Sequence, residues 1–320
     1  MEGSVCLVTG AAGFIGSHLT ERLVRDGARL HAVVRPGSEV GRIAHIADKI
    51  VIHRADLEDG DALKACVELV QPEIVFHLGA ETRAGTHVSP AAAQLSVKQL
   101  LEPLICLVDA LDGLPVPPTV LVRAGSIAEY GAVPLPYRED VREAPSNPYG
   151  TALLAGTQYL EMLAGKLTFP VITARLALTY GPGQSHTFLL PALIEACVEG
   201  RDFEIKRPDD RRDMIHVDEV VDALLCLAKQ HDRACRLVNI GTGVAPTMRE
   251  VAETVVAQTG CDPQRVHFGA GQSTPTELRS DTSRAWKVFG WRASLSMKDG
   301  LARLLSAGDG GNLRAGHGSG

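Results

Sequence analysis

The fold is indicated by a glycine-rich stretch near the N-terminus, which reads Thr9-Gly10-Ala11-Ala12-Gly13-Phe14-Ile15-Gly16. It directly follows an apolar run at residues 5–9, which has the composition of a buried β-strand. A helical pattern follows from residue 17. Glycines allow a strand-to-helix turn to approach a phosphate closely, and the amides at the start of the helix attract negative charge. The stretch therefore predicts a dinucleotide-binding turn rather than a tight turn without a ligand.

Short β-branched runs alternate with helix-like segments through the first half of the chain. We expect strands at residues 5–9, 30–34, 50–53, 74–78, 120–123 and 171–176, and helices at residues 17–26, 61–70, 91–111 and 149–166. Continuous apolar strands separated by helices are typical of a parallel sheet covered on both faces. The pattern predicts an α/β fold with a doubly wound parallel sheet of the Rossmann type.

The rhythm becomes irregular after residue 180, which predicts a smaller, interleaved substrate-binding domain. We expect helices at residues 188–199 and 217–229, a charged turn at 209–213 and a strand at 236–240. Thr247 and Glu250 have the spacing of a capping box, which predicts a helix that extends through residue 257. We expect the dinucleotide-binding domain to comprise residues 1–178 and 212–243, the substrate domain residues 179–211 and 244–306, and residues 307–320 to form a flexible tail.

Composition and charge argue against several classes of protein. The 320 residues carry 32 Lys and Arg against 38 Asp and Glu, and this net charge of −6 argues against nucleic-acid binding. No apolar run approaches the roughly 18–20 residues that span a bilayer, and there is no room for a signal segment before the first strand. We therefore expect a cytoplasmic protein without a membrane partner. The seven cysteines and the histidines lack metal-ligand spacing, so we expect reduced thiols and no metal site.

Ordered motifs along nearly the whole chain resemble the extended branch of the short-chain dehydrogenase/reductase superfamily, of the NAD-dependent epimerase/dehydratase type that modifies nucleotide sugars. The first turn has that family's TGxxGFIG pattern, and further matches include residues 76–80, 147–150, 180–183 and 239–243. The resemblance implies that the cofactor contacts Gly10, Gly13, Phe14, Ile15, Gly16, Asp56, Leu57, Leu78, Ala80 and Tyr149.

The end of the second strand bears on the choice of cofactor. NAD-specific relatives place an acidic residue there, which accepts hydrogen bonds from the ribose hydroxyls. This chain has Val34 followed by Arg35. A guanidinium can pair with the 2′-phosphate of NADP(H), although a solvated Arg at a strand end explains the residue without any ligand. We favour NADP(H), and NAD(H) is the alternative.

The resemblance also implies a catalytic Ser or Thr, a Tyr, and a Lys four residues after the Tyr. Ser126 and Tyr149 match the first two, but Leu153 stands where the Lys is expected. The Lys normally favours the tyrosinate form and hydrogen-bonds the nicotinamide ribose. Its loss weighs most against an enzyme that first oxidises an alcohol, because that step needs Tyr149 as a base. A reductase needs Tyr149 protonated and suffers less.

Other residues near this centre have alternative interpretations. Dehydratases carry an Asp-Glu pair after their catalytic Thr, whereas this chain has Ile127 and Ala128. Glu129 is either an auxiliary polar group or, as we favour, a surface or loop carboxylate. Lys98 could replace the missing Lys, but a solvated side chain is the favoured interpretation.

The leading hypothesis is an NADP(H)-dependent ketoreductase of deoxysugar biosynthesis. It would act on a 4-keto-6-deoxyhexose carried on a nucleoside diphosphate, with Ser126 polarising the carbonyl and Tyr149 donating the proton. A 4-epimerase with tightly bound NAD and a catalytically decayed dinucleotide-binding protein are the alternatives. Arg212 lies in the motif with which relatives hold the diphosphate, so the resemblance implies that it binds the substrate phosphates. A salt bridge with Asp209, Asp210 or Asp213 is the alternative role of this side chain. A homodimer is expected through the helices at residues 91–111 and 149–166.

Overall fold

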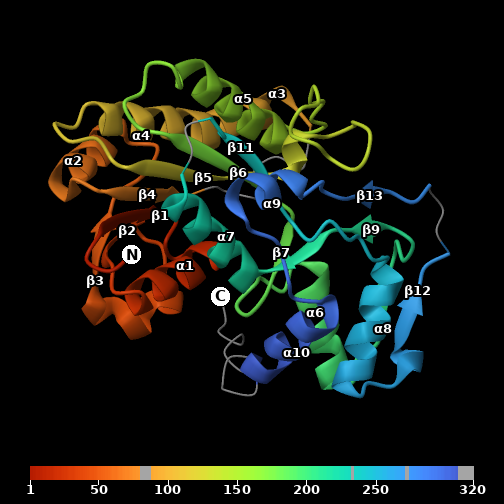
Figure 1. The fold of residues 1–320 in the computed structure, drawn as a ribbon. Coiled ribbons are helices and arrows are strands. Elements are labelled where there is room, and N and C mark those ends of the chain that lie inside the picture. The colour runs from red at the N-terminus through yellow and green to blue at the C-terminus, as the bar shows by residue number, and fades with distance from the viewer. Residues whose placement is uncertain (80–87, 232–233, 271–273, 309–320) are drawn as a thin grey trace.

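Seven parallel strands form the central sheet of the computed structural model, which describes residues 1–79, 88–231, 234–270 and 274–308 (Figure 1). Their order is β11-β6-β5-β4-β1-β2-β3. The strands are β1 (Val5–Thr9), β2 (Arg29–Val34), β3 (Ile50–Arg54), β4 (Ile74–His77), β5 (Val120–Ser126), β6 (Val171–Leu176) and β11 (Leu237–Ile240). The order reverses direction between β1 and β4, and ligands of such sheets bind at that point, beyond the carboxyl ends of the strands. The predicted doubly wound α/β fold is confirmed.

Helices cover both faces of the sheet because successive strand residues point to opposite sides. Leu7 of β1 packs with α2 (Gly60–Val70), α4 (Glu102–Asp112) and α5 (Pro148–Leu163) in one buried cluster. Its neighbour Val8 packs into a second cluster with α1 (Phe14–Arg25), α7 (Val217–Lys229) and α9 (Ser283–Phe289). The predicted helix at residues 149–166 begins one residue earlier, at Pro148, and ends three residues earlier, at Leu163.

One helical run corrects an expectation from the sequence. The α3 helix (Pro90–Ser96), a π-helical turn (Val97–Leu101) and α4 form a continuous run of 23 residues, long and apolar enough to cross a membrane by length and composition. The expectation that no apolar run approaches that length was wrong. Core helices of soluble proteins pass the same test, and Leu104, Leu107 and Leu111 are fully buried against the sheet.

A third buried cluster lies beside the sheet and contains the irregular second half of the chain. It is built from α6 (Leu189–Glu199), α8 (Met248–Thr259) and α10 (Met297–Gly308), with β8 (Phe203–Ile205) paired to β12 (Val266–Phe268). The predicted capping box is present at the start of α8, where the Thr247 hydroxyl accepts from the Glu250 amide. The domain boundaries stay a prediction, and Ala285 and Phe289 of α9 pack into the core of the sheet.

Short strands connect the two parts of the molecule. β7 (Leu178–Tyr180) pairs with β10 (Met214–His216), and β9 (Arg211–Arg212) pairs with β13 (Glu277–Leu278). The charged turn expected at residues 209–213 therefore contains a short strand instead. Pairing with a segment 66 residues further along the chain decides this, since Arg211 aligns with Glu277.

Candidate active site

The glycine-rich stretch forms the turn between β1 and α1, and its glycines are required by close backbone contacts. Gly10 has a φ of +69°, and a Cβ there would lie 2.7 Å from the carbonyl of Leu78. A Cβ on Gly16 would lie 2.0 Å from the Gly10 oxygen. The N-cap residue of α1 is Gly13, which has no side chain that could accept from the first amides of this helix, so Gly13 leaves those amides open to a ligand. The turn fits the pyrophosphate of a dinucleotide.

A cavity of about 400 Å³ opens beside this turn. Of the residues expected to contact a cofactor, it is lined by Gly10, Gly13, Arg35, Asp56, Leu57 and Leu78. Phe14, Ile15 and Gly16 form the first turn of α1 and are not among the lining residues. Ala80 lies outside the described residues. The cavity therefore joins the glycine turn to the ends of β2 and β3, as an adenosine-binding site requires.

Sequence reasoning missed several polar residues of this cavity. Ser38, Glu39 and Arg42 line it beside Arg35, from the segment that follows β2. The Arg42 guanidinium donates to the carbonyl oxygens of Ala12, at 3.4 Å, and Gly183, at 3.0 Å. The only signal in the sequence was the polar run after the second strand. Arg35 and Arg42 thus give this cavity two guanidinium groups.

Ser126 and Tyr149 come together at the carboxyl end of the sheet. Ser126 ends β5, and Tyr149 is the second residue of α5, whose start is capped by the Asn147 side chain through a 2.8 Å bond from the Gly150 amide. Burial raises the pKa of Tyr149 to about 12, and the negative charge of Glu129 adds to this effect. A hydrogen bond with the Ser126 side chain and the positive charge of Arg123 act in the opposite direction. Tyr149 is therefore a protonated phenol at neutral pH.

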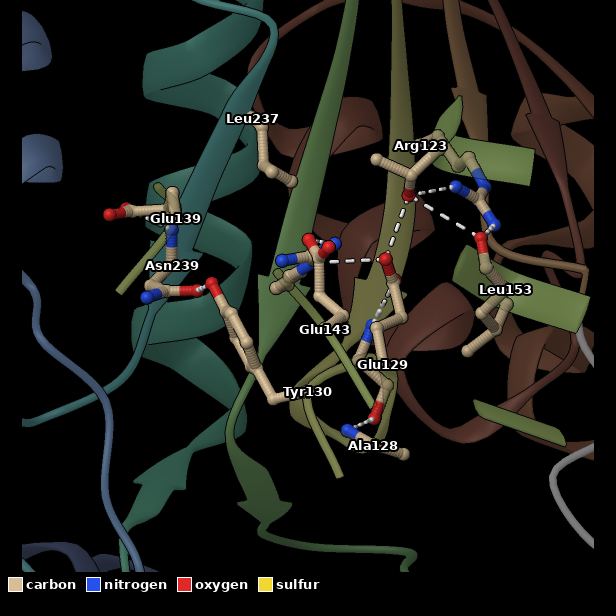
Figure 2. Close-up of polar contacts among 12 residues, drawn as sticks. Arg123, Ala128, Glu129, Tyr130, Glu139, Glu143, Leu153, Leu237 and Asn239 are labelled. Carbon is tan, nitrogen blue, oxygen red and sulfur yellow. Dashed lines mark hydrogen bonds and ion pairs between the residues drawn. The ribbon is translucent and has the colours of Figure 1, made fainter. Parts of the chain in front are cut away.

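The position that follows Tyr149 by one helical turn carries no charge. Leu153 is 3% exposed and packs inside the protein. The guanidinium of Arg123, from β5, donates to the Leu153 carbonyl oxygen at 2.9 Å and to the Thr157 hydroxyl at 3.0 Å (Figure 2). Lys98 does not replace the missing lysine, because its exposed ammonium pairs with Glu58 at 3.1 Å.

Glu129 is fully buried, so the favoured interpretation of a surface or loop carboxylate was wrong. It belongs to the short 3-10 helix η3 (Ile127–Glu129), which begins directly after Ser126. Its carboxylate pairs with the Arg175 guanidinium of β6 at 2.9 Å and accepts a hydrogen bond from the Thr157 hydroxyl at 2.7 Å. The tertiary contact with β6 buries this residue, and the residues next to it in the sequence do not predict that contact.

The Arg212 guanidinium is engaged by neighbouring side chains. One of its terminal nitrogens donates to the Asp210 carboxylate at 2.7 Å and to the Thr276 hydroxyl at 2.9 Å. The salt bridge weighed as an alternative is therefore present, with Asp210 as the partner. Binding of a substrate phosphate by Arg212 stays a prediction.

A family model described as the NAD dependent epimerase/dehydratase family matches residues 6–241 of this chain. The chain belongs to this family. The resemblance to extended short-chain dehydrogenases/reductases that act on nucleotide sugars is thereby confirmed.

Individual members of the family differ in the reaction that they catalyse. The chain is 30% identical to UDP-glucose 4-epimerase of Mycolicibacterium smegmatis, over 93% of this chain and 96% of that protein. It is 27% identical to GDP-6-deoxy-D-mannose reductase of Pseudomonas aeruginosa, over 93% of this chain and 95% of that protein. A solved structure of MoeE5 in complex with UDP-glucose and NAD is 30% identical, with a TM-score of 0.78 over 95% of this chain and 98% of that one.

His77, at the end of β4, makes the stability of the fold dependent on pH. Its ring contacts the Thr9 hydroxyl at 2.8 Å, and burial, aided by the charge of Arg123, lowers the pKa of His77 to about 3. In the unfolded chain His77 binds a proton near pH 6.5, whereas in the native state it stays neutral until the pH falls to about 3. Stability is therefore present above pH 6.5 and is lost as the pH falls below it.

We expect His77→Asn to reduce, by about 1.6 kcal/mol, the loss of stability between pH 6.5 and pH 5, as measured by urea unfolding at both values. His45→Asn is the control, because the His45 side chain is exposed. An unchanged pH dependence in His77→Asn would contradict this assignment.

Proposed function

We propose that this protein is an NADP(H)-dependent ketoreductase that reduces the 4-keto group of a 6-deoxyhexose carried on a nucleoside diphosphate. The observation that carries the proposal is the protonated Tyr149 with Leu153, rather than a lysine, one turn later. A group whose pKa lies well above neutrality carries its proton at pH 7, so it is present as a proton donor and almost absent as a base. Reduction of a ketone needs a proton donor at the carbonyl oxygen, whereas oxidation of an alcohol needs a base.

The roles of the residues follow from their positions. The turn at Gly10 and Gly13 and the cavity lined by Arg35 would hold the dinucleotide, whose nicotinamide supplies the hydride when bound. The Ser126 hydroxyl would donate a hydrogen bond to the substrate carbonyl oxygen and polarise it. Tyr149 would transfer its phenolic proton to the same oxygen as the carbon is reduced, and solvent would then restore that proton.

The residues of this site suit the other reactions of the family, dehydration and epimerisation, less well than reduction. Ile127 and Ala128 leave the position after Ser126 without the acid and base that a dehydratase needs. A 4-epimerase is the second candidate, because the Mycolicibacterium smegmatis relative is a UDP-glucose 4-epimerase. An epimerase must first remove a hydroxyl proton, a step that the raised pKa of Tyr149 opposes.

A homodimer is part of the proposal. The helical run of α3 and the π turn lies against α5, and apolar side chains on these segments are exposed, at Leu95, Val97, Tyr159 and Met162. Pairing of these helices with their copies in a second subunit would bury them.

Preference for NADPH over NADH should depend on Arg35. We expect Arg35→Ala to weaken NADPH binding about tenfold or more, since a charge-assisted hydrogen bond contributes about 1.5–3 kcal/mol, and to leave NADH binding nearly unchanged. Fluorescence titration of the purified protein measures both affinities. Arg29→Ala is the matched control, because Arg29 lies at the opposite end of β2 and is exposed.

The same titration separates the candidate functions. Tighter binding of NADPH, followed by its oxidation when nucleoside-diphosphate 4-keto-6-deoxyhexoses are added, supports the ketoreductase. Preference for NADH, or NAD that remains bound through purification, would favour the epimerase. Binding without any turnover, even in Leu153→Lys, would indicate a decayed site.

A further inference from the structure

The buried Glu129 carboxylate adjoins the Ser126–Tyr149 pair and has no part in the reaction described above. We propose that Glu129 is a positioning residue of the active site, which holds Ser126 at the end of β5 and whose buried negative charge opposes ionisation of the Tyr149 phenol. This inference rests on the proposed ketoreductase function, since a reductase uses Tyr149 as an acid.

Both carboxylate oxygens of Glu129 are engaged. Oε1 accepts from the Ser126 backbone amide at 3.1 Å and completes a capping box around the start of η3. Oε2 accepts from the Thr157 hydroxyl at 2.7 Å and from Arg175 Nε at 2.9 Å. The Ser126 hydroxyl in turn accepts from the Ala128 amide at 3.1 Å. Glu129 thus fixes the backbone of the residue whose hydroxyl meets Tyr149.

Glu129 belongs to a network of four side chains whose charges alternate in sign. Arg123 reaches Glu129 through the Thr157 hydroxyl, and Arg175 joins Glu129 to Glu143, whose carboxylate lies 2.7 Å from an Arg175 terminal nitrogen. Arg175 also lies over the Tyr130 ring, 4.4 Å from its centroid. A buried ion pair adds little net stability compared with apolar side chains of similar volume. Stability alone therefore does not account for this network.

Two glycines provide the space that the buried charges occupy. A Cβ on Gly125 would lie 2.4 Å from Glu129 Oε1, and a Cβ on Gly156 would lie 2.8 Å from an Arg123 terminal nitrogen. Gly156 lies inside α5, where glycine costs about 1 kcal/mol relative to alanine. The chain thus gives up helix stability at a position where any side chain would displace the guanidinium.

Opposite charges act on Tyr149 from the elements packed against it. Glu129 of η3 raises the pKa of Tyr149, whereas Arg123 of β5 and the hydrogen bond with Ser126 lower it. On α5 itself, Leu153 adds no charge. The lost lysine and the buried glutamate therefore act in the same direction, since both favour the neutral phenol.

The test is an ultraviolet titration of tyrosinate, which needs neither substrate nor cofactor. The signal of Tyr149 is isolated by subtracting the curve of Tyr149→Phe from that of its parent, because the chain has five tyrosines. Glu129→Gln should lower the midpoint of the Tyr149 titration by about 1 pH unit or more, since a neighbouring charge shifts a pKa by about 1–3. Leu153→Lys is the positive control, because it places a cation one helical turn from the phenol.

Each outcome decides the matter separately from the proposed reaction. A Glu129→Gln protein that is folded by circular dichroism, but whose Tyr149 titrates as in the parent while Leu153→Lys shifts it, would overturn the role of Glu129. If Glu129→Gln does not fold, the double variant Glu129→Gln with Arg175→Met takes its place, because it removes both partners of the ion pair. The same shift of the Tyr149 titration to lower pH is then expected. An unshifted titration in the folded double variant would overturn the role of Glu129. If Glu129→Gln shifts the Tyr149 titration but the parent protein reduces no 4-keto sugar nucleotide, the role of Glu129 is supported and the proposed reaction is rejected.

Discussion

Tyr149→Phe should lower kcat for ketone reduction by about 10²–10⁴-fold, the usual contribution of a positioned general acid. The substitution keeps the ring and removes only the hydroxyl that donates the proton. NADPH binding should change much less than kcat, because the substitution removes at most one of the expected cofactor contacts and leaves the glycine turn and the Arg35 cavity in place. Single-turnover oxidation of bound NADPH by a 4-keto sugar nucleotide measures the chemical step directly.

Tyr159→Phe is the matched control for this prediction. Tyr159 lies on the same helix, α5, its side chain is exposed in the single chain, and the substitution keeps the ring that would pack in the proposed dimer. It should retain the activity of the parent protein. A Tyr149→Phe protein with undiminished kcat would show that another group delivers the proton and would remove the central argument for the reductase.

Arg175→Met should destabilise the protein by about 3–5 kcal/mol, because it leaves the Glu129 carboxylate buried without its cationic partner. Arg175 and Glu129 are both fully buried, at an N–O distance of 2.9 Å. Methionine fills much of the volume of the arginine, so most of the loss reflects the uncompensated charge rather than a cavity. Urea unfolding at neutral pH measures the change.

The control is Arg22→Met, which breaks ion pairs with Asp26 and Asp222 at the surface. These groups are partly exposed, so a loss of about 0–1 kcal/mol is expected. Similar losses from the two substitutions would mean that water reaches Glu129 in solution.

Much of the fold was predictable because its signals are local. The buried strands have continuous apolar runs, and β1 and β6 have the bounds that the sequence predicts. The helix α7 also has its predicted bounds, and the capping box of α8 is formed by neighbouring residues. The glycine turn is likewise local, since its spacing is set by contacts between a strand end and the helix that follows.

The site was predictable only in part. Ser126, Tyr149 and the substitution at Leu153 were recognised from motifs of adjacent residues. Glu129 was misread, because a glutamate in a short segment after a strand normally faces solvent. Its burial depends on Arg175, which lies 46 residues further along the chain.

The sequence by itself determined the doubly wound sheet, the glycine turn after β1 and the residue types at positions 126, 149 and 153, since periodicity, glycine spacing and residue type are local properties. Only the tertiary structure decided the electrostatic environment of Tyr149. Burial and the charges of Glu129 and Arg123 act on the phenol, while Thr157 and Arg175 hold the Glu129 carboxylate, and these four residues lie on four different elements. Electrostatic interactions depend on distance and burial rather than on order in the chain, so these four residues acquire their effect only when β5, η3, α5 and β6 pack together.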